Sequence, residues 1–349
     1  MFYDISLNDR FDLKKDSVLL NGPQALVRLC LIQSERDKLK GLSTSGYITG
    51  YRGSPLGAVD QQFNRAKNIL TERKVFFREA LNEDLAATAI WGAQQANIRG
   101  DGATDGVYSL WYGKGPGVDR SGDVFRHANL AGTDPNGGVL VAMGDDHTGE
   151  SSTALHQSEY ALIDSMIPIF SPAGVQELLD FGVLGWELSR FAGVWVGLKC
   201  MKDTVEVTEV VDGSIERIEV KKPVFSFPEE GVQIRTNDLA AIQEERLHKV
   251  KIPAVKAFAR ANNLNKVVFS KEGAKIGLVS AGKSWLDTVH ALDLLGINEQ
   301  KARELGISTF KVGLVWPLEE ETLIEWASGL DLIIVLEEKR KLLEDQIKS

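Results

Sequence analysis

The stretch that decides the fold is residues 75–87, VFFREALNEDLAA, in which a short apolar segment turns directly into the start of a helix. Residues 75–81 carry the aromatic and β-branched side chains typical of a short strand. Asn82 can cap a helix, and the two carboxylates that follow it would complement the helix dipole. The stretch therefore predicts a strand and then a helix over residues 82–98, the repeating unit of a parallel α/β sheet.

The same alternation of strand and helix patterns continues on both sides of this stretch. Residues 41–51 (GLSTSGYITGY) are typical of a strand that runs into a glycine-rich turn, and residues 58–74 show the helical spacing of apolar side chains. Such alternation with short connections predicts crossover units and a mainly parallel sheet. Further strands are predicted at residues 138–143, 167–170, 194–199, 275–280, 308–315 and 331–336, and further helices at 284–295 and 318–327.

The pattern changes in the middle of the chain. Residues 205–220 alternate polar and β-branched side chains around Asp212-Gly213, which predicts a β-hairpin. Residues 239–262 predict a charged amphipathic helix that is broken or kinked at Pro253. We therefore expect a first domain at residues 1–225 with the hairpin near its end, a connector and helix at 226–270, and a second α/β domain at 271–349.

Composition narrows the class of protein. The 349 residues include 40 Lys and Arg against 49 Asp and Glu, and this net charge of −9 argues against binding of nucleic acid. Cys30 and Cys200 lie in apolar segments and are too few for a zinc site or an iron–sulfur cluster. No apolar run approaches the roughly 20 residues that span a bilayer. Residues 1–15 do not resemble a signal peptide. We expect a cytoplasmic protein with reduced thiols and no membrane partner.

Several motifs imitate other chemistry. Residues 277–284 (GLVSAGKS) match the spacing of a phosphate-binding loop, but the residues after the first glycine still have the pattern of a strand, so the backbone could not wrap a phosphate. Residues 113–117 (GKGPG) lack the spacing of a dinucleotide fingerprint. Gly100-Asp101-Gly102 with Asn129 imitates a diphosphate and Mg²⁺ motif, but it follows a helix pattern instead of a strand. We assign no metal ligands.

A longer set of motifs identifies a family. They are GYRGSPLG at residues 50–57, ALNEDLAA at 80–87, WYGKGPGVDRSGDVFRHA at 111–128 and GGVLVAMGDDHTGESS at 137–152. With them the chain resembles, over essentially its whole length, the front portion of the fused large-subunit form of indolepyruvate ferredoxin oxidoreductase. The resemblance implies that residues 1–225 form the pyrimidine-binding domain of a thiamine-diphosphate enzyme. It also implies that residues 271–349 form a smaller α/β domain like the C-terminal domain of transketolase.

The resemblance implies a role for Glu83. Thiamine diphosphate serves as a carbanion sink once its thiazolium has lost a proton to the imino form of the aminopyrimidine. Glu83 matches the glutamate whose hydrogen bond to the ring nitrogen drives that tautomerisation. Without the resemblance, the simpler interpretation is that Asn82 and the two carboxylates after it only form the start of a helix. Asn82, Gly53 and Ser54 are assigned to the cofactor site beside Glu83.

The resemblance also implies a substrate site. Ser54 lies where relatives carry a threonine before proline, and its hydroxyl would bind the 2-oxo or carboxylate group of the substrate. Arg126 lies where an arginine for the substrate carboxylate is expected, and Arg120 is the competing candidate. His147, with Asp146, follows the strand at residues 138–143, where ligands of α/β sheets gather, although spacing alone favours a hydrogen-bonded loop. Arg52 departs from the proline of many relatives.

The implied reaction of the complete enzyme is oxidative decarboxylation of indolepyruvate or a related aryl 2-oxoacid, with transfer of the acyl group to coenzyme A and of electrons to ferredoxin. The diphosphate-binding domain with Mg²⁺ and the iron–sulfur clusters are expected elsewhere in the fused enzyme or on a partner subunit. We therefore expect this chain alone to be inactive, and we expect a homodimer. The alternatives are a non-oxidative thiamine-diphosphate enzyme, such as a decarboxylase or transketolase-like protein, and a non-catalytic assembly module.

Overall fold

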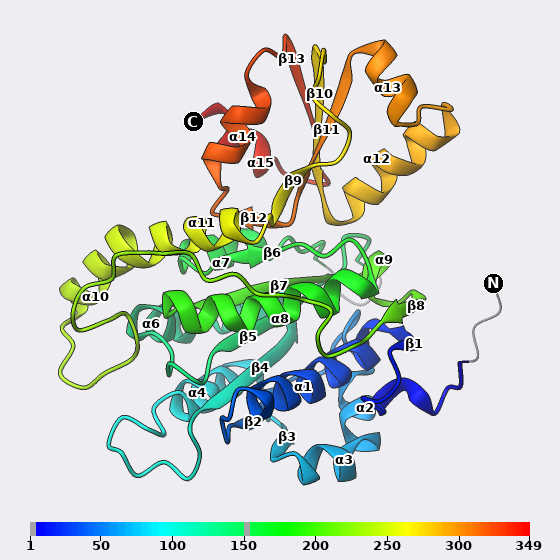
Figure 1. Cartoon of the computed structure of the whole chain (residues 1–349). Coiled ribbons are helices and arrows are strands. Elements are labelled where there is room, and N and C mark those ends of the chain that lie inside the picture. The colour runs from blue at the N-terminus through cyan, green and yellow to red at the C-terminus, as the bar shows by residue number, and fades with distance from the viewer. Residues whose placement is uncertain (1–4, 150–153) are drawn as a thin grey trace.

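The computed structural model describes residues 5–149 and 154–349, so the end of the fourth motif, residues 150–152, lies outside the described residues. Strands of the described residues form a large sheet, a smaller sheet that lies above it in the view of Figure 1, and a short two-stranded ribbon. This arrangement confirms the predicted α/β class. No helix in the described ranges is long and apolar enough to cross a bilayer.

The large sheet has seven strands in the order β12-β6-β7-β5-β4-β2-β3, and all of them except the edge strand β12 are parallel. Every residue of the central strands β5 and β7 is buried, because helices cover both faces of the sheet. The bounds of the strands are β2 Ser45–Gly50, β3 Val75–Glu79, β4 Val107–Lys114, β5 Val139–Asp145, β6 Ile169–Phe170, β7 Trp195–Met201 and β12 Leu314–Trp316.

Helices α1 and α8 pack together on one face of this sheet, and α4 to α7 lie over the other. Arg190 on α8 donates two hydrogen bonds to the buried carboxylate of Asp37 on α1, at 2.6 and 2.8 Å. This bidentate pair ties the two helices to each other. The bounds of the helices are α1 Gly22–Leu39, α2 Val59–Arg65, α3 Lys67–Glu72, α4 Glu83–Ala93, α5 Gly115–Arg120, α6 Gly122–Ala131, α7 Glu159–Asp164, α8 Val175–Ala192 and α9 Lys202–Val205.

The predicted hairpin at residues 205–220 is wrong. Only β8 (Thr208–Asp212) forms there, and it pairs antiparallel with β1 (Ser17–Asn21) from the start of the chain. The fully buried guanidinium of Arg28 donates to the carbonyl of Gly213 at 2.8 and 3.1 Å and so fixes the chain after β8. The alternation of side chains correctly predicted a strand, but the strand that pairs with it comes from a distant segment of the chain.

The smaller sheet has the order β13-β10-β11-β9, with β9 antiparallel to β11 and the other pairs parallel. The predicted strand at 308–315 divides at Gly313, because its last part, β12, leaves this sheet and joins the large one. The two sheets are thus connected by a shared segment of chain. The remaining bounds are β9 Asn265–Val267, β10 Ile276–Ala281, β11 Ile307–Val312, β13 Leu332–Leu336, α12 Gly282–Leu294, α13 Glu299–Leu305, α14 Glu320–Ala327 and α15 Leu343–Lys348.

Two predicted helices are shorter or more irregular than expected. The helix predicted at 82–98 ends at Ala93, because the side chain of Gln94 turns inward and donates to the carbonyl of Val107 at 2.7 Å. The helix predicted at 239–262 consists of α10 (Ala240–Arg246), a π-helical turn (Leu247–Lys251) and α11 (Ile252–Ala261). The irregular turn directly precedes Pro253, so the helix is irregular there, but the chain stays helical through the proline and is not broken.

Candidate functional site

The parallel strands of the large sheet end at one edge, and this edge carries the candidate site. Lys114 is the last residue of β4, and the segments that follow β2, β3 and β5 contain Ser54, Glu83 and Asp146. Ligands of α/β proteins bind at the carboxyl ends of strands because loops and helix starts converge at that edge. Residues far apart in the sequence therefore meet at one surface.

Glu83 begins helix α4, and its side chain is largely buried, with 8% of the residue exposed. Asn82 caps the helix, as predicted, by accepting a hydrogen bond from the Leu85 amide at 2.9 Å. The indole Nε1 of Trp111 donates to the carbonyl oxygen of Glu83 at 3.1 Å. The backbone of Glu83 is thus held from two sides, which restricts where its carboxylate can point.

Gly117 in helix α5 forms the other wall beside Glu83. A Cβ atom at Gly117 would lie 2.5 Å from Cγ and 2.7 Å from Oε1 of Glu83, closer than atoms can pack. The absence of a side chain at this position therefore leaves the space that the glutamate occupies. The motif at residues 111–128 contributes to the family resemblance, but no role was predicted for Gly117 within it.

Ser54 lines a small cavity next to this glutamate-bearing edge. Lys114, Asp146 and His156 line the same cavity. The Ser54 hydroxyl donates to Glu206 at 3.4 Å, and Asp146 accepts from the amides of residues 148 and 149. Gly53 lies directly against the side chain of Lys114, since a Cβ there would be 2.7 Å from Lys114 Cδ. The predicted residues Ser54 and Gly53 are thus brought together with a lysine that the sequence reasoning missed.

The two candidate arginines lie outside this cavity. Arg120 pairs with Asp84 at 2.6 Å, and both side chains are partly exposed. Arg126 forms an ion pair with Asp164 of helix α7, again at the surface. Neither arginine is among the residues that line the cavity of Ser54. Lys114 is instead the cation that the structure places beside Ser54.

His147 points away from Ser54 and toward the smaller sheet. Its buried ring lies 3.9 Å from the carboxylate of Asp145 and 3.3 Å from that of Glu338, which follows β13. Burial alone would raise the pKa of Asp145, but His147, the Lys199 ammonium and hydrogen bonds from Ser158 outweigh it and lower that pKa to about 2. These contacts place the His147 ring between the two sheets instead of beside Ser54.

Asn129 has a structural role, because its side chain is fully hydrogen-bonded within the fold. Its side-chain amide donates to the carbonyls of Ser165 and Met166, and its oxygen accepts from the amide of Trp195. These contacts are those of a buried residue that fixes a turn against β7. The strand pattern of residues 277–284 also holds, since β10 continues to Ala281 and α12 begins at Gly282.

The fold, a mainly parallel sheet with a second, smaller sheet beside it, is shared with solved α/β enzymes. A solved 2-oxoglutarate:ferredoxin oxidoreductase from Magnetococcus marinus superposes with a TM-score of 0.71 at 14% identity, over 96% of this chain and 60% of that one. A transketolase variant from Pichia stipitis superposes with a TM-score of 0.50 at 12% identity, over 95% of this chain and 45% of that one. At such identities these likenesses show the fold.

Similarity in sequence identifies the relatives more narrowly. The chain is 24% identical over 345 residues to the indolepyruvate oxidoreductase subunit IorA of Methanothermobacter marburgensis, and 25% identical over 347 residues to that of Pyrococcus abyssi. These matches cover 98% and 97% of the chain but only 50% and 48% of the relatives, so the chain spans about half their length. Residues 266–349 match the indolepyruvate oxidoreductase domain. The predicted resemblance to indolepyruvate oxidoreductases is confirmed.

Proposed function

We propose that the chain is the part of a thiamine-diphosphate-dependent 2-oxoacid:ferredoxin oxidoreductase that activates the cofactor's aminopyrimidine ring. The observation that carries this proposal is the position of Glu83, whose carboxylate is buried against Gly117 at the carboxyl edge of a parallel sheet. A carboxylate held in such a place can share a proton with a ring nitrogen. The bound cofactor would supply the carbanion chemistry of decarboxylation.

The surface around Glu83 suits an aromatic ring and a covering domain. Leu81, Leu85 and Tyr51 lie next to it in the sequence or after the neighbouring strand, and they are 87%, 50% and 40% exposed. Exposed apolar side chains in one place mark a surface that binds a ligand or another protein surface. We assign the covering surface to the diphosphate-binding domain with Mg²⁺, in the remainder of the enzyme or in a partner subunit.

Ser54 and Lys114 are the residues of this chain that we assign to the substrate. The serine hydroxyl can donate to the 2-oxo group, and the lysine ammonium can pair with the carboxylate at the same cavity. Lys114 lines the cavity of Ser54 and neither Arg120 nor Arg126 does, which favours Lys114 over both. Asn82 then acts by capping helix α4, which begins at Glu83, and Gly53 through its contact with Lys114.

We base the assignments of substrate, acceptors, domains and assembly on the family resemblance and on the relatives that match in sequence. The substrate is indolepyruvate or another aryl 2-oxoacid, the acyl group passes to coenzyme A, and ferredoxin receives the electrons through iron–sulfur clusters outside this chain. Residues 1–225 form the pyrimidine-binding domain and residues 271–349 the transketolase C-terminal-like domain. The two buried free cysteines suit a reducing cytoplasm. We assign a homodimer, because the site is completed across an interface.

The test is anaerobic reduction of ferredoxin or a viologen by the complete enzyme with thiamine diphosphate, Mg²⁺, coenzyme A and indolepyruvate. The proposal expects reduction that requires all four components and yields the acyl-coenzyme A. Release of an aldehyde without reduction of the acceptor would instead identify a non-oxidative decarboxylase. Full activity without thiamine diphosphate would contradict the proposal and leave the chain as an assembly module.

A further inference from the structure

The smaller sheet has an open edge at β13, and none of the described residues forms a strand beyond it (Figure 1). The five residues of this strand, Leu332–Leu336 (LIIVL), are all apolar and pair in parallel with β10. Among the described residues, no backbone hydrogen bond reaches the outer side of β13. The free N–H and C=O groups of such an edge form a template on which a further strand can pair.

The other edges of the two sheets carry features that prevent such pairing. At the opposite edge of the smaller sheet, β9 has only three residues and contains Lys266. In the large sheet, β12 has three residues and is followed by Pro317, and β3 contains Arg78 and Glu79. Short length, charge and proline all disfavour the addition of a strand. Because β13 has none of these features, it is the edge of the two sheets that is open to another strand.

One face of β13 is also uncovered. Ile333 and Val335 pack against the core cluster that contains Trp326 of α14. Leu332 and Ile334 alternate with them, so they point to the opposite face, and they are 52% and 40% exposed. Helices α12 and α13 lie on that opposite face, but they connect β10 to β11 and leave β13 at its margin (Figure 1). Since strands of parallel sheets are normally covered on both faces, an occupant should supply apolar cover as well as backbone hydrogen bonds.

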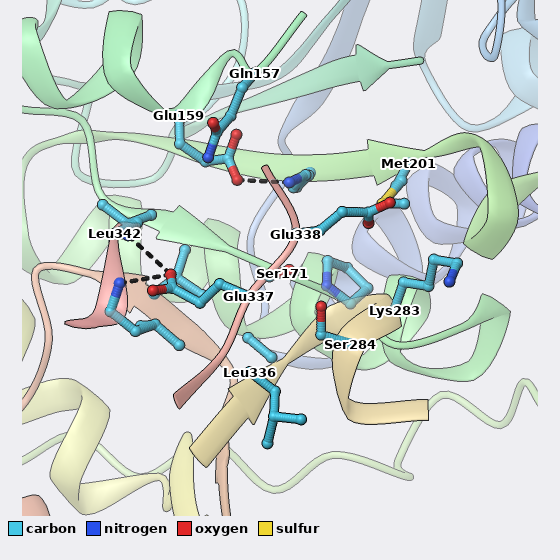
Figure 2. Close-up of a pocket in the computed structure, with 15 residues that line it drawn as sticks. Gln157, Glu159, Ser171, Met201, Lys283, Ser284, Leu336, Glu337, Glu338 and Leu342 are labelled. Atoms are coloured by element: carbon cyan, nitrogen blue, oxygen red, sulfur yellow. Dashed lines mark hydrogen bonds and ion pairs between the residues drawn. The ribbon is translucent and has the colours of Figure 1, made fainter. Parts of the chain in front are cut away.

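The backbone of β13 is fixed at both ends, which makes the edge a rigid template. Before the strand, the amide of Asp331 donates to the carbonyl of Lys275 at 2.8 Å. After the strand, the carboxylate of Glu337 accepts a hydrogen bond from the amide of Leu342 at 2.9 Å (Figure 2). A segment that pairs with β13 therefore meets a preformed edge, and less conformational entropy is lost when it binds.

A second copy of the chain would satisfy only part of this surface. Two β13 strands can pair antiparallel about a twofold axis, but that axis is perpendicular to the sheet and keeps the uncovered faces of both copies on the same side. Leu332 and Ile334 of both copies would then remain exposed, and the apolar surface would become larger. The surface instead fits an apolar strand that is joined to an apolar helix lying over Leu332 and Ile334.

We propose that a strand from the rest of the fused enzyme, outside residues 1–349, pairs with β13 and that a helix joined to it covers Leu332 and Ile334. The inference rests on the proposed function, in which this chain is one part of a larger enzyme, and on the curated relatives, of which the chain spans about half. The added strand would hold the smaller sheet to the rest of the enzyme. It would leave the edge with Glu83 free, because that edge belongs to the large sheet.

The test is hydrogen exchange of the complete enzyme, measured by mass spectrometry on a peptide that contains residues 331–337. About half of the amides of an edge strand point outward, and these exchange quickly unless another strand binds them. We expect all the amides of β13 to exchange at least about 100-fold more slowly than in an unfolded peptide. Fast exchange of about half of them would overturn the proposal. So would protection that rises with enzyme concentration, which would assign the edge to a second copy, or protection that requires a separate subunit.

Two lysine substitutions provide matched variants, because Ile334 and Val267 are both 40% exposed and lie on the opposite edge strands of the same sheet. Ile334→Lys places a charge under the proposed helix, so exchange of the β13 amides should become about 10-fold faster or more. Val267→Lys on β9 should leave the exchange of β13 unchanged. Equal exchange of β13 in the two folded variants would contradict the added strand. If Ile334→Lys does not fold, exchange in the parent enzyme still decides.

This result is separable from the proposed function, which acceptor reduction tests. Slow exchange of β13 in an enzyme that does not reduce ferredoxin or a viologen would support the added strand and contradict the oxidoreductase assignment. Reduction of the acceptor by an enzyme in which β13 exchanges quickly would support the function and contradict the added strand.

Discussion

At the level of single residues, the candidate site depends on Lys114 more than on either predicted arginine. Lys114 lines the cavity of Ser54, whereas Arg120 and Arg126 are paired with Asp84 and Asp164 at the surface. An ammonium group provides a point charge for a carboxylate, without the two-pronged geometry of a guanidinium. We therefore propose that Lys114, in place of either arginine, supplies the charge for the substrate carboxylate.

A substitution of Lys114 tests this assignment. In the complete enzyme, Lys114→Met should raise KM for the 2-oxoacid about 10- to 100-fold, because one charged hydrogen bond to the carboxylate is lost. Lys114→Arg should recover part of the affinity, and Arg126→Met should change KM little. The measurement is steady-state kinetics over a range of 2-oxoacid concentrations. An unchanged KM in Lys114→Met would return the assignment to one of the arginines.

Gly117 tests the space beside Glu83. A methyl group at Gly117 would overlap Cγ of Glu83, so Gly117→Ala should displace the carboxylate and lower kcat about 10-fold or more in a protein that still folds. The matched control is Gly122→Ala, since a Cβ at Gly122 meets no atom within 4 Å. Both variants can be compared by viologen reduction and circular dichroism. Equal activity of the two would mean that the position of Glu83 is unimportant.

At the level of elements, helices α1 and α8 are joined by a buried ion pair that the sequence did not reveal. Asp37 accepts from Arg190 twice, from Gln33 and from Thr44, and its carboxylate is fully buried. Asp37→Asn should lower the free energy of unfolding by about 3 kcal/mol, because the guanidinium is left with a neutral partner. Urea unfolding measures the change. Asp164→Asn, which breaks an exposed pair, should have little effect, and equal destabilisation by both would contradict this account.

Lys251 gives a pH-dependent contribution to stability. Its ammonium donates to the carbonyls of Leu130 and Gly193, where helices α6 and α8 end, and burial lowers its pKa to about 7. An unfolded lysine titrates near 10.5, so the unfolded chain holds more protons between pH 7 and 10 and stability should rise with pH there, by up to about 1.4 kcal/mol per pH unit.

Lys251→Met should remove this contribution. Urea unfolding of both proteins between pH 7 and 10 is the measurement, and the parent should show the steeper rise. Parallel pH profiles would mean that the lysine stays protonated over the whole range in the folded protein. That result would assign more weight to the carbonyl partners than to burial.

The elements also show what could be predicted from the sequence. Strands with continuous apolar patterns, such as residues 138–143, were predicted closely because burial on both faces leaves an unambiguous signal. The strand at residues 208–212 was recognised, but its pairing with β1 was not, since alternation does not identify a distant partner. The start of α4 at Asn82 was predicted from its cap, whereas its end depends on a tertiary contact of Gln94.

The candidate site was partly predictable for a similar reason. Glu83, Asn82, Gly53 and Ser54 follow strands, and the ends of parallel strands converge. Lys114 is the last residue of β4, but the sequence analysis gave it no role, and His156 was missed because it lies before α7, far along the chain from Ser54. His147 was predicted at the correct strand end, but its side chain turns toward the smaller sheet. The alternation of side chains along a strand predicts directions only up to the strand's last residue, so the direction of His147 could not be predicted.

At the level of the whole molecule, the carboxyl edge of the large sheet serves two purposes. One part carries Glu83 beneath exposed apolar side chains, and another part receives the smaller sheet through His147, Glu338 and the joined strand β12. The chain spans about half the length of the curated relatives that it matches, and in the proposed function another domain completes the site. We therefore expect this chain by itself to bind thiamine diphosphate poorly and to transfer no electrons.

The most direct test of the central claim compares Glu83→Gln with the parent in the complete enzyme, under anaerobic conditions with indolepyruvate, coenzyme A, Mg²⁺ and thiamine diphosphate. Glutamine keeps the size of the side chain but cannot hold the shared proton in the same way, so acceptor reduction should fall by about 100-fold or more while the variant remains folded. The account predicts that loss. Equal rates in the two proteins would contradict it and would leave Glu83 as a residue that only begins a helix.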